Sequence, residues 1–286
     1  MIVPDRQQGR LAWLIAAAAL ASAAAASLTL FLPDVLLGPA VTNGNARGTA
    51  LVMLVLGAPL LLAAGLLQQR GWRWAPVMCI GLLAYLAYNG FMFLTATPYN
   101  RLFLVYVLAM STTVFALGAS VLRVEPSLVA ERLPRVPARV VGGYILTIVV
   151  LNTFLWLSKI VRTVLGEDPT TIVAGTGVAT NPVFVQDLVF WLPSAFIIGW
   201  LAWTRRPYGA LLAGAYLVYG VLESVGVAVD QWFGTTADPT TEIATMGAVY
   251  LFAVLAVIGI GALVFYAWAL QRGAVVRAEV PKPAAA

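Results

Sequence analysis

The chain has 286 residues, of which 61% are hydrophobic and only 10% are charged. A soluble domain carries roughly 25% charged residues, so this composition excludes an ordinary water-soluble protein. The mean hydropathy of +0.91 agrees with that exclusion. The net charge of +5 is interpreted as loop charge beside a membrane, and not as a surface for nucleic acid.

The sequence contains no histidine and a single cysteine, Cys79. These counts exclude His-ligated haem, His-based zinc sites, Ser-His nucleophiles and CxxC redox pairs. Cys79 lies in an apolar run, where a cysteine packs as a small hydrophobic residue. We therefore expect neither a metal nor another cofactor.

Eight stretches are long and apolar enough to cross a bilayer, which takes about 20 residues. They cover residues 11–32, 49–68, 74–96, 101–122, 140–161, 183–204, 207–229 and 245–270. Turn-forming residues lie between them, as in Pro33-Asp34, Asn43-Gly44-Asn45, Pro98-Tyr99-Asn100 and Gly166-Glu167-Asp168-Pro169. The sequence predicts one transmembrane domain over residues 1–286, an all-α bundle of eight helices.

The distribution of Lys and Arg over alternate connections predicts the orientation of these helices. Thirteen basic residues fall on the side of the termini: Arg6, Arg10, Arg70, Arg73, Arg123, Arg132, Arg135, Arg139, Arg205, Arg206, Arg272, Arg277 and Lys282. Four fall on the other side: Arg47, Arg101, Lys159 and Arg162. Because basic residues concentrate in cytoplasmic loops, we predict that both termini are cytoplasmic.

The first span also resembles a signal peptide, with two Arg residues, an Ala-rich core and small residues from Ala21 to Ser27. Its apolar run continues to Leu32, which is longer than a usual signal core. We interpret it as a retained first helix. Cleavage would leave the orientation of the other seven helices unchanged.

Three ionisable residues lie inside predicted helices, where a charge costs about 2.5–3.5 kcal/mol at the membrane centre. They are Lys159, Asp187 and Glu223. At 1.5 Å per residue, Lys159 lies about 30 Å and Glu223 about 25 Å from the inner end of its helix, and Asp187 lies about 7 Å from its outer end. We therefore expect all three toward the outer side of the membrane.

Other polar side chains are expected at the same level. Asn152 shares a helix face with Lys159, Tyr219 shares one with Glu223, and Pro193 permits a kink after Asp187. The main hypothesis is an outward-facing polar pocket that binds or transports a small solute, an ion or a lipid head group. Its candidate residues are Asn89, Arg101, Tyr106, Asn152, Lys159, Gln186, Asp187, Tyr219 and Glu223.

Two other functions and one structural interpretation stay open. The chain could be a non-catalytic membrane subunit whose polar residues bind a partner, or, less favoured, an intramembrane enzyme that uses Asp187 with Glu223. Structurally, Lys159 could reach the interface or form an ion pair with Asp187. No catalytic residue is assigned, because the sequence lacks a GxSxG motif and a metal-ligand cluster. Gly175-Thr176-Gly177 lacks the GK[ST] ending of a phosphate loop and is interpreted as part of a flexible outer loop, residues 163–181.

Two stretches of the sequence are similar to a family of uncharacterised bacterial polytopic membrane proteins. One comprises Tyr88-Asn89 and the run from Tyr99-Asn100-Arg101 to Tyr106. The other runs from Asn181-Pro182 through Gln186-Asp187 to Leu188, with Pro193 and Arg205-Arg206-Pro207-Tyr208-Gly209 after it. The resemblance implies a location in the bacterial inner membrane and draws attention to Asn100 and Asp187. It implies no particular activity.

Overall fold

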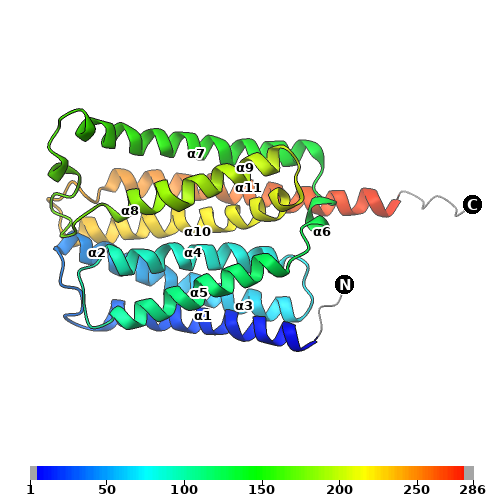
Figure 1. Cartoon of the computed structure of the whole chain (residues 1–286), viewed down its shortest axis with the longest axis horizontal. Coiled ribbons are helices and arrows are strands. Elements are labelled where there is room, and N and C mark those ends of the chain that lie inside the picture. The colour runs from blue at the N-terminus through cyan, green and yellow to red at the C-terminus, as the bar shows by residue number, and fades with distance from the viewer. Residues whose placement is uncertain (1–4, 280–286) are drawn as a thin grey trace, which may run out of the picture.

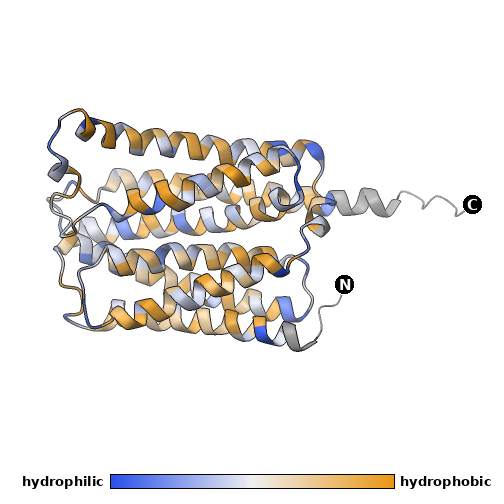
Figure 2. Cartoon of the chain, in the orientation of Figure 1, coloured by the Kyte–Doolittle hydropathy of each residue, from blue (hydrophilic) through white to orange (hydrophobic). Residues whose placement is uncertain are grey.

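The computed structural model describes residues 5–279, apart from the side chains of residues 5–8, 128 and 273–279. Within this part, eight helical spans are long and apolar enough to cross a membrane, and no strand occurs. Apolar residues cover the middle of the bundle and hydrophilic residues gather at its two ends (Figure 2). The predicted all-α bundle of eight transmembrane helices is confirmed, and the chain is a multi-pass integral membrane protein.

The spans follow one another in chain order. The first two are α1 (Asp5–Phe31) and a continuous span made of α2 (Ala40–Val52), the π-helical turn η1 (Met53–Gly57) and α3 (Ala58–Gln69). Next come α4 (Ala75–Thr95), α5 (Phe103–Arg123), the short α6 (Ser127–Ala130) and α7 (Arg135–Val164). The sixth span comprises α8 (Pro182–Gln186), the π-helical turn η3 (Asp187–Trp191) and α9 (Leu192–Trp203), and the last two are α10 (Pro207–Ala237) and α11 (Met246–Glu279).

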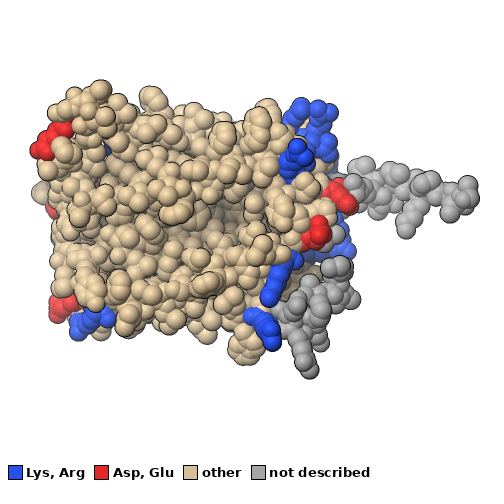
Figure 3. Space-filling view, in the orientation of Figure 1, with Lys and Arg blue, Asp and Glu red and all other residues tan. Residues whose placement is uncertain are grey.

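The bundle has one end rich in Lys and Arg, which we name the basic end; its opposite is the far end. The start of α1, the short α6 and the last turns of α11 lie at the basic end (Figures 1 and 3). Of the basic residues that we assign to this side, the side chains of Arg6, Arg277 and Lys282 lie outside the described residues. A cytoplasmic basic end remains our prediction.

Helices α4 and α10 occupy the middle of the bundle (Figure 1). Helix α10 packs against α2, α4, α9 and α11, whereas α1 packs against α3 and α5 at one edge. Helix α7 forms the other edge and packs mainly against α9. The large apolar side chains that α7 and α11 leave exposed, such as Phe154 and Val257, suit contact with lipid.

The second span begins at Ala40, nine residues before the predicted start at residue 49. The predicted turn Asn43-Gly44-Asn45 is therefore wrong, because these residues are helical. A Cβ atom on Gly44 would lie 2.6 Å from the Phe233 carbonyl oxygen, and one on Gly48 would lie 2.5 Å from Asp230 Cα. These glycines thus permit close contact between α2 and α10, as small residues spaced by four do in membrane helix pairs.

The seventh span ends at Ala237, eight residues beyond the predicted end at residue 229. Asp230 is therefore a helical residue. Glu223 lies about 24 Å from the start of α10 and about 21 Å from its end, near the middle of this helix. The helix continues because the chain has no proline until Pro239, and because Gly234 packs against Asn45 of α2.

The two π-helical turns share a local cause. In η1 the Ala58 N–H bonds to the Met53 carbonyl, and in η3 the Leu192 N–H bonds to the Asp187 carbonyl. A proline, Pro59 or Pro193, follows immediately in each case. Since a proline ring clashes with the carbonyl four residues earlier, the wider π turn accommodates it. The predicted irregularity near Pro193 thus takes the form of a π turn.

The connection over residues 163–181, which we predict to be a flexible outer loop, contains local regular structure. It contains a 3-10 turn, η2 (Pro169–Ile172), and Asp168 Oδ1 accepts the Thr170 N–H at 2.9 Å, which lowers the pKa of the Asp168 carboxyl. The Thr42 hydroxyl of α2 donates to the Thr176 carbonyl at 3.0 Å. This hydrogen bond therefore joins the loop to α2 at the far end of the bundle.

Because α2 and α10 pack so closely, we predict that one methyl group added at their contact lowers the stability of the protein. Gly48→Ala would press a Cβ atom against the backbone of Asp230, and we expect a loss of about 1–3 kcal/mol of stability. Gly118→Ala on α5 is the matched control, because no atom lies within 4 Å of its added Cβ. Thermal unfolding of the purified protein in detergent measures both changes. Equal melting temperatures for the two variants would contradict this account of the contact.

Candidate functional site

The carboxylate of Asp187 is the centre of the candidate site. It lies on the first residue of η3, and the residue is only 6% exposed. Its Oδ1 accepts the Tyr88 hydroxyl of α4 at 3.0 Å, and its Oδ2 accepts the Trp156 indole N–H of α7 at 2.7 Å. Three spans therefore meet at one carboxylate in the half of the bundle toward the far end.

Glu223 joins the same region through the residue that follows Tyr88. The Asn89 amide donates to Glu223 Oε2 and to the Tyr85 carbonyl, both at 3.0 Å. The Gln186 amide donates to the Tyr88 carbonyl at 3.2 Å. Neighbouring residues on a helix point about 100° apart. Helix α4 therefore contacts η3 through Tyr88 and contacts α10 through Asn89. We name the set of Tyr88, Asn89, Trp156, Gln186, Asp187 and Glu223 the Asp187 network.

Aromatic rings pack beside this network. The rings of Trp191 and Tyr219 stack with an angle of 8° and a centroid distance of 4.9 Å. Tyr88 contacts both, at 5.3 and 5.9 Å, and Tyr216 contacts Tyr219 at 5.8 Å. We name these four rings the aromatic cluster. It fills the space between α4, η3 and α10 and orients the Tyr88 hydroxyl toward Asp187.

The structure thus brings together five of the candidate residues: Asn89, Gln186, Asp187, Tyr219 and Glu223. Lys159 is exposed, and its ammonium group lies 5.7 Å from the centroid of the Trp156 ring. The proposed ion pair between Lys159 and Asp187 does not occur among the described residues, and the two Asp187 oxygens accept hydrogen bonds from neutral donors. Asn152 lies one turn before Trp156 and makes no hydrogen bond to the network in the described part of the chain.

Two further candidate residues lie in other parts of the bundle. Arg101 is exposed, and its guanidinium donates to the Pro33 carbonyl at 2.9 Å. Tyr106 is buried, with its hydroxyl 2.9 Å from the Thr29 hydroxyl of α1. Both therefore connect α5 and its preceding loop to the first span, rather than contributing to the Asp187 network.

Two buried polar atoms near the network have no hydrogen-bond partner. They are the Gln186 Oε1 atom, on a residue that is 1% exposed, and the Tyr85 hydroxyl, on a residue that is 0% exposed. A buried polar group without a partner costs about 1–3 kcal/mol, which a bound water or ligand would recover. Both atoms can accept a hydrogen bond.

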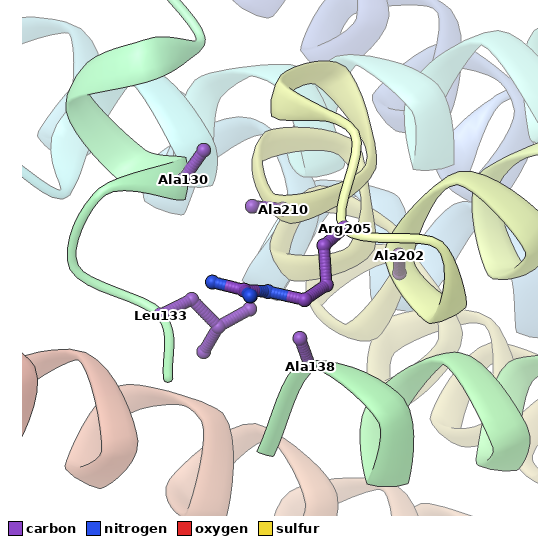
Figure 4. A pocket seen from close by; sticks show the side chains of 6 residues that line it. All are labelled: Ala130, Leu133, Ala138, Ala202, Arg205 and Ala210. Atoms are coloured by element: carbon purple, nitrogen blue, oxygen red, sulfur yellow. The ribbon is translucent and has the colours of Figure 1, made fainter. Parts of the chain in front are cut away.

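Two small cavities lie away from the network. One, of about 30 Å³, is at the basic end and is lined by Ala130, Leu133, Ala138, Ala202, Arg205 and Ala210 (Figure 4). The other, of about 70 Å³, is at the far end of α4 and α5, where Tyr106 and Asn100 contribute to its lining. Spaces of this size suit water molecules and not a solute. Neither cavity is lined by Asp187 or Glu223.

The sequence-based candidates did not include six residues near the site: Tyr85, Tyr88, Trp156, Trp191, Tyr216 and Asp230. In the sequence, Trp156 and Trp191 look like ordinary apolar membrane residues. Their positions alone do not predict that Trp156 donates a hydrogen bond to a carboxylate or that Trp191 stacks on another ring. Asp230 was missed because the predicted helix ended at residue 229. One signal for Trp156 exists, since it lies at i+4 from Asn152 and i−3 from Lys159, on the polar face of its helix.

The arrangement is suited to binding rather than to catalysis. The network and its surroundings present two carboxylates, an amide oxygen and a hydroxyl as acceptors. No group of three or more Cys, Asp or Glu side chains that could hold a metal ion occurs among the described residues. The ligand that fits such acceptors carries positive charge or several N–H or O–H donors.

Comparison of the chain with protein families, with curated proteins and with solved structures gave no match.

The indole hydrogen bond to Asp187 can be tested by removing the donor alone. Trp156→Phe keeps an aromatic ring against Phe184 but leaves Oδ2 without a donor, and we expect a loss of about 1–2 kcal/mol of stability. Trp200→Phe is the control, because the Trp200 side chain is exposed on α9. Thermal unfolding measures both variants. A Trp156→Phe protein as stable as the control would show that this hydrogen bond contributes nothing.

Proposed function

We propose that the protein binds a small solute at the Asp187 network. The observation that carries the proposal is the environment of Asp187, a carboxylate that is 6% exposed and bonded only to the neutral donors Tyr88 and Trp156. A charge in a membrane helix is costly, so ionisable residues there usually serve a function. A bound solute with a positive charge would complete the site.

The chemistry of the solute follows from the balance of donors and acceptors. Asp187 and Glu223 are both acids, and Gln186 Oε1 is an acceptor without a donor. Lys159 is exposed, and its ammonium group lies over the Trp156 ring, 5.7 Å from the ring centroid. We therefore favour a cation, or a neutral solute rich in N–H and O–H groups, over an anion.

We extend the proposal to transport across a bacterial inner membrane, which is the location that the family resemblance implies. With the basic end in the cytoplasm, the network faces outward. The sixth span contains the π turn η3, which begins at Asp187 and is followed by Pro193, and π turns within helices occur frequently at functional sites. A change in the π turn would alter the position of Asp187 directly.

The alternative function is that of a non-catalytic membrane subunit. The aromatic cluster packs beside Asp187, and neither of the two cavities described above is lined by this residue. This lack of a solute-sized cavity at Asp187 favours the subunit. An enzyme is less favoured, because Asp187 and Glu223 are held by different donors and do not share a hydrogen-bond partner.

The test is a ligand-stability screen on the full-length protein in detergent, with amines, inorganic cations, neutral polyols and carboxylates. We expect a cationic or donor-rich compound to raise the melting temperature saturably. Asp187→Asn should weaken its binding at least tenfold, which is about 1.4 kcal/mol. Asp168→Asn, in the exposed outer loop, is the matched control and should leave binding unchanged. A ligand bound equally by wild type and Asp187→Asn would contradict the proposed site, and a screen without any ligand would favour the subunit.

A further inference from the structure

Gly220, in the middle of α10, borders an open space. No atom lies within 4 Å of a Cβ atom built on this glycine, although α10 occupies the middle of the bundle (Figure 1). Gly220 lies about 20 Å from the start of α10 and about 26 Å from its end. The space therefore lies at the depth of the hydrocarbon core of a bilayer.

The residues on either side of Gly220 are packed against other helices. Tyr219 stacks on Trp191 of η3. Val221 lies against α11, since a Cβ atom on Gly259 would lie 3.1 Å from Val221 Cγ2. Successive residues of a helix point about 100° apart, so Gly220 points between these two contacts. The open space is therefore on the side of α10 between η3 and α11, which neither of them covers.

Glu223 shares this side of α10. Tyr216, Gly220 and Glu223 are spaced i, i+4 and i+7, and all three are partly exposed. We name these three residues the open face of α10. Glu223 Oε2 accepts the Asn89 amide at 3.0 Å, whereas no hydrogen bond or ion pair engages Oε1 within the described residues. A charge at the middle of a membrane helix costs about 2.5–3.5 kcal/mol, so a partly exposed acid there calls for a bound group.

The surroundings define the chemistry of that group. An acid without a basic partner favours a positive charge with N–H donors. Aromatic rings also stabilise ammonium groups, and Tyr216 lies on the open face while Tyr219 interacts electrostatically with Glu223. Because the face opens at the depth of the hydrocarbon core, a molecule that reaches it from the lipid needs an apolar part. A hydrated inorganic cation lacks such a part.

We propose that the open face of α10 binds the ammonium group of an amphiphilic amine dissolved in the membrane, whose alkyl chain extends into the lipid. This inference rests on the proposed function and deepens it, because it names the class of solute and the side from which the solute reaches the network. Glu223 would accept the N–H donors, and the absent side chain of Gly220 would leave room for the first carbon atoms of the alkyl chain.

The test is the binding of dodecylamine to the full-length protein in phosphatidylcholine nanodiscs, with the amine at low mole fraction in the lipid. Thermal unfolding measures the binding. We expect dodecylamine to raise the melting temperature saturably. At the same total concentration, dodecanol lacks the charge and ethylamine lacks the chain, so neither should raise it.

Two variants locate the site. Glu223→Gln removes the charge but keeps an acceptor for Asn89, and it should weaken the binding of dodecylamine about tenfold. Gly220→Leu should weaken binding to a similar extent because its side chain fills the open space, and it should fold because no atom lies within 4 Å of the added Cβ.

Each variant has a matched control. Gly118→Leu places the same side chain on α5, where the added Cβ also has no atom within 4 Å. Glu242→Gln removes an exposed acid that lies outside the membrane spans. Both controls should bind dodecylamine as the wild type does.

The outcomes separate this inference from the proposed function. Three results would each overturn the open face as a site: no stabilisation by dodecylamine, equal stabilisation by ethylamine, or unchanged binding in Glu223→Gln and Gly220→Leu. Each of them leaves an Asp187-dependent small solute intact. Binding of dodecylamine that depends on Glu223 and Gly220, but is unchanged in Asp187→Asn, would confirm the open face and overturn the proposed contact with Asp187.

Discussion

A carboxylate buried in a membrane needs hydrogen-bond donors, and the need of Asp187 for donors connects three spans of this protein. Tyr88 supplies one donor from α4 and Trp156 supplies the other from α7. Helix α7 stands at the edge of the bundle and packs mainly on α9, so the indole hydrogen bond fixes its far half relative to η3. The same carboxylate is carried by the first residue of the π turn of the sixth span.

Helix α10 provides the second half of the arrangement. Glycines lie at its contacts with α2 and α4, among them Gly48 of α2 and Gly81 of α4. They allow the backbones of the paired helices to approach closely. Where α10 instead faces Tyr85, Gly226 packs closely against the ring of that tyrosine. The helix thus combines tight packing with one polar face, on which Glu223 and Asp230 lie. Lipid-facing helices such as α11 carry no comparable charge within the described membrane span.

Hydropathy was sufficient to predict the eight spans, because the bilayer imposes their length and composition. It also predicted the start of the sixth span, where Asn181 accepts the N–H groups of Val183 and Phe184. It failed for the start of α2 and the end of α10, because Gly44, Asn45 and Asp230 suggest a loop in isolation and are helical only through mutual packing. The structure brings Asn89, Gln186, Asp187, Tyr219 and Glu223 together, whereas their level toward the outer side of the membrane stays a prediction. Arg101, Tyr106 and Lys159 lie apart from the Asp187 network because of tertiary contacts, and helical spacing in the sequence does not predict such contacts.

The stability of unliganded Asp187→Asn tests most directly whether Asp187 is kept for binding or for structure. A buried charge retained for a ligand is a cost in the free protein, and Asn would still accept a hydrogen bond at one oxygen. The account predicts that the melting temperature of Asp187→Asn, measured without any added solute, equals or exceeds that of the wild type. A decrease of several degrees would mean that the charge itself is needed to hold α4, α7 and η3 together in the free protein, and would contradict its retention for a ligand.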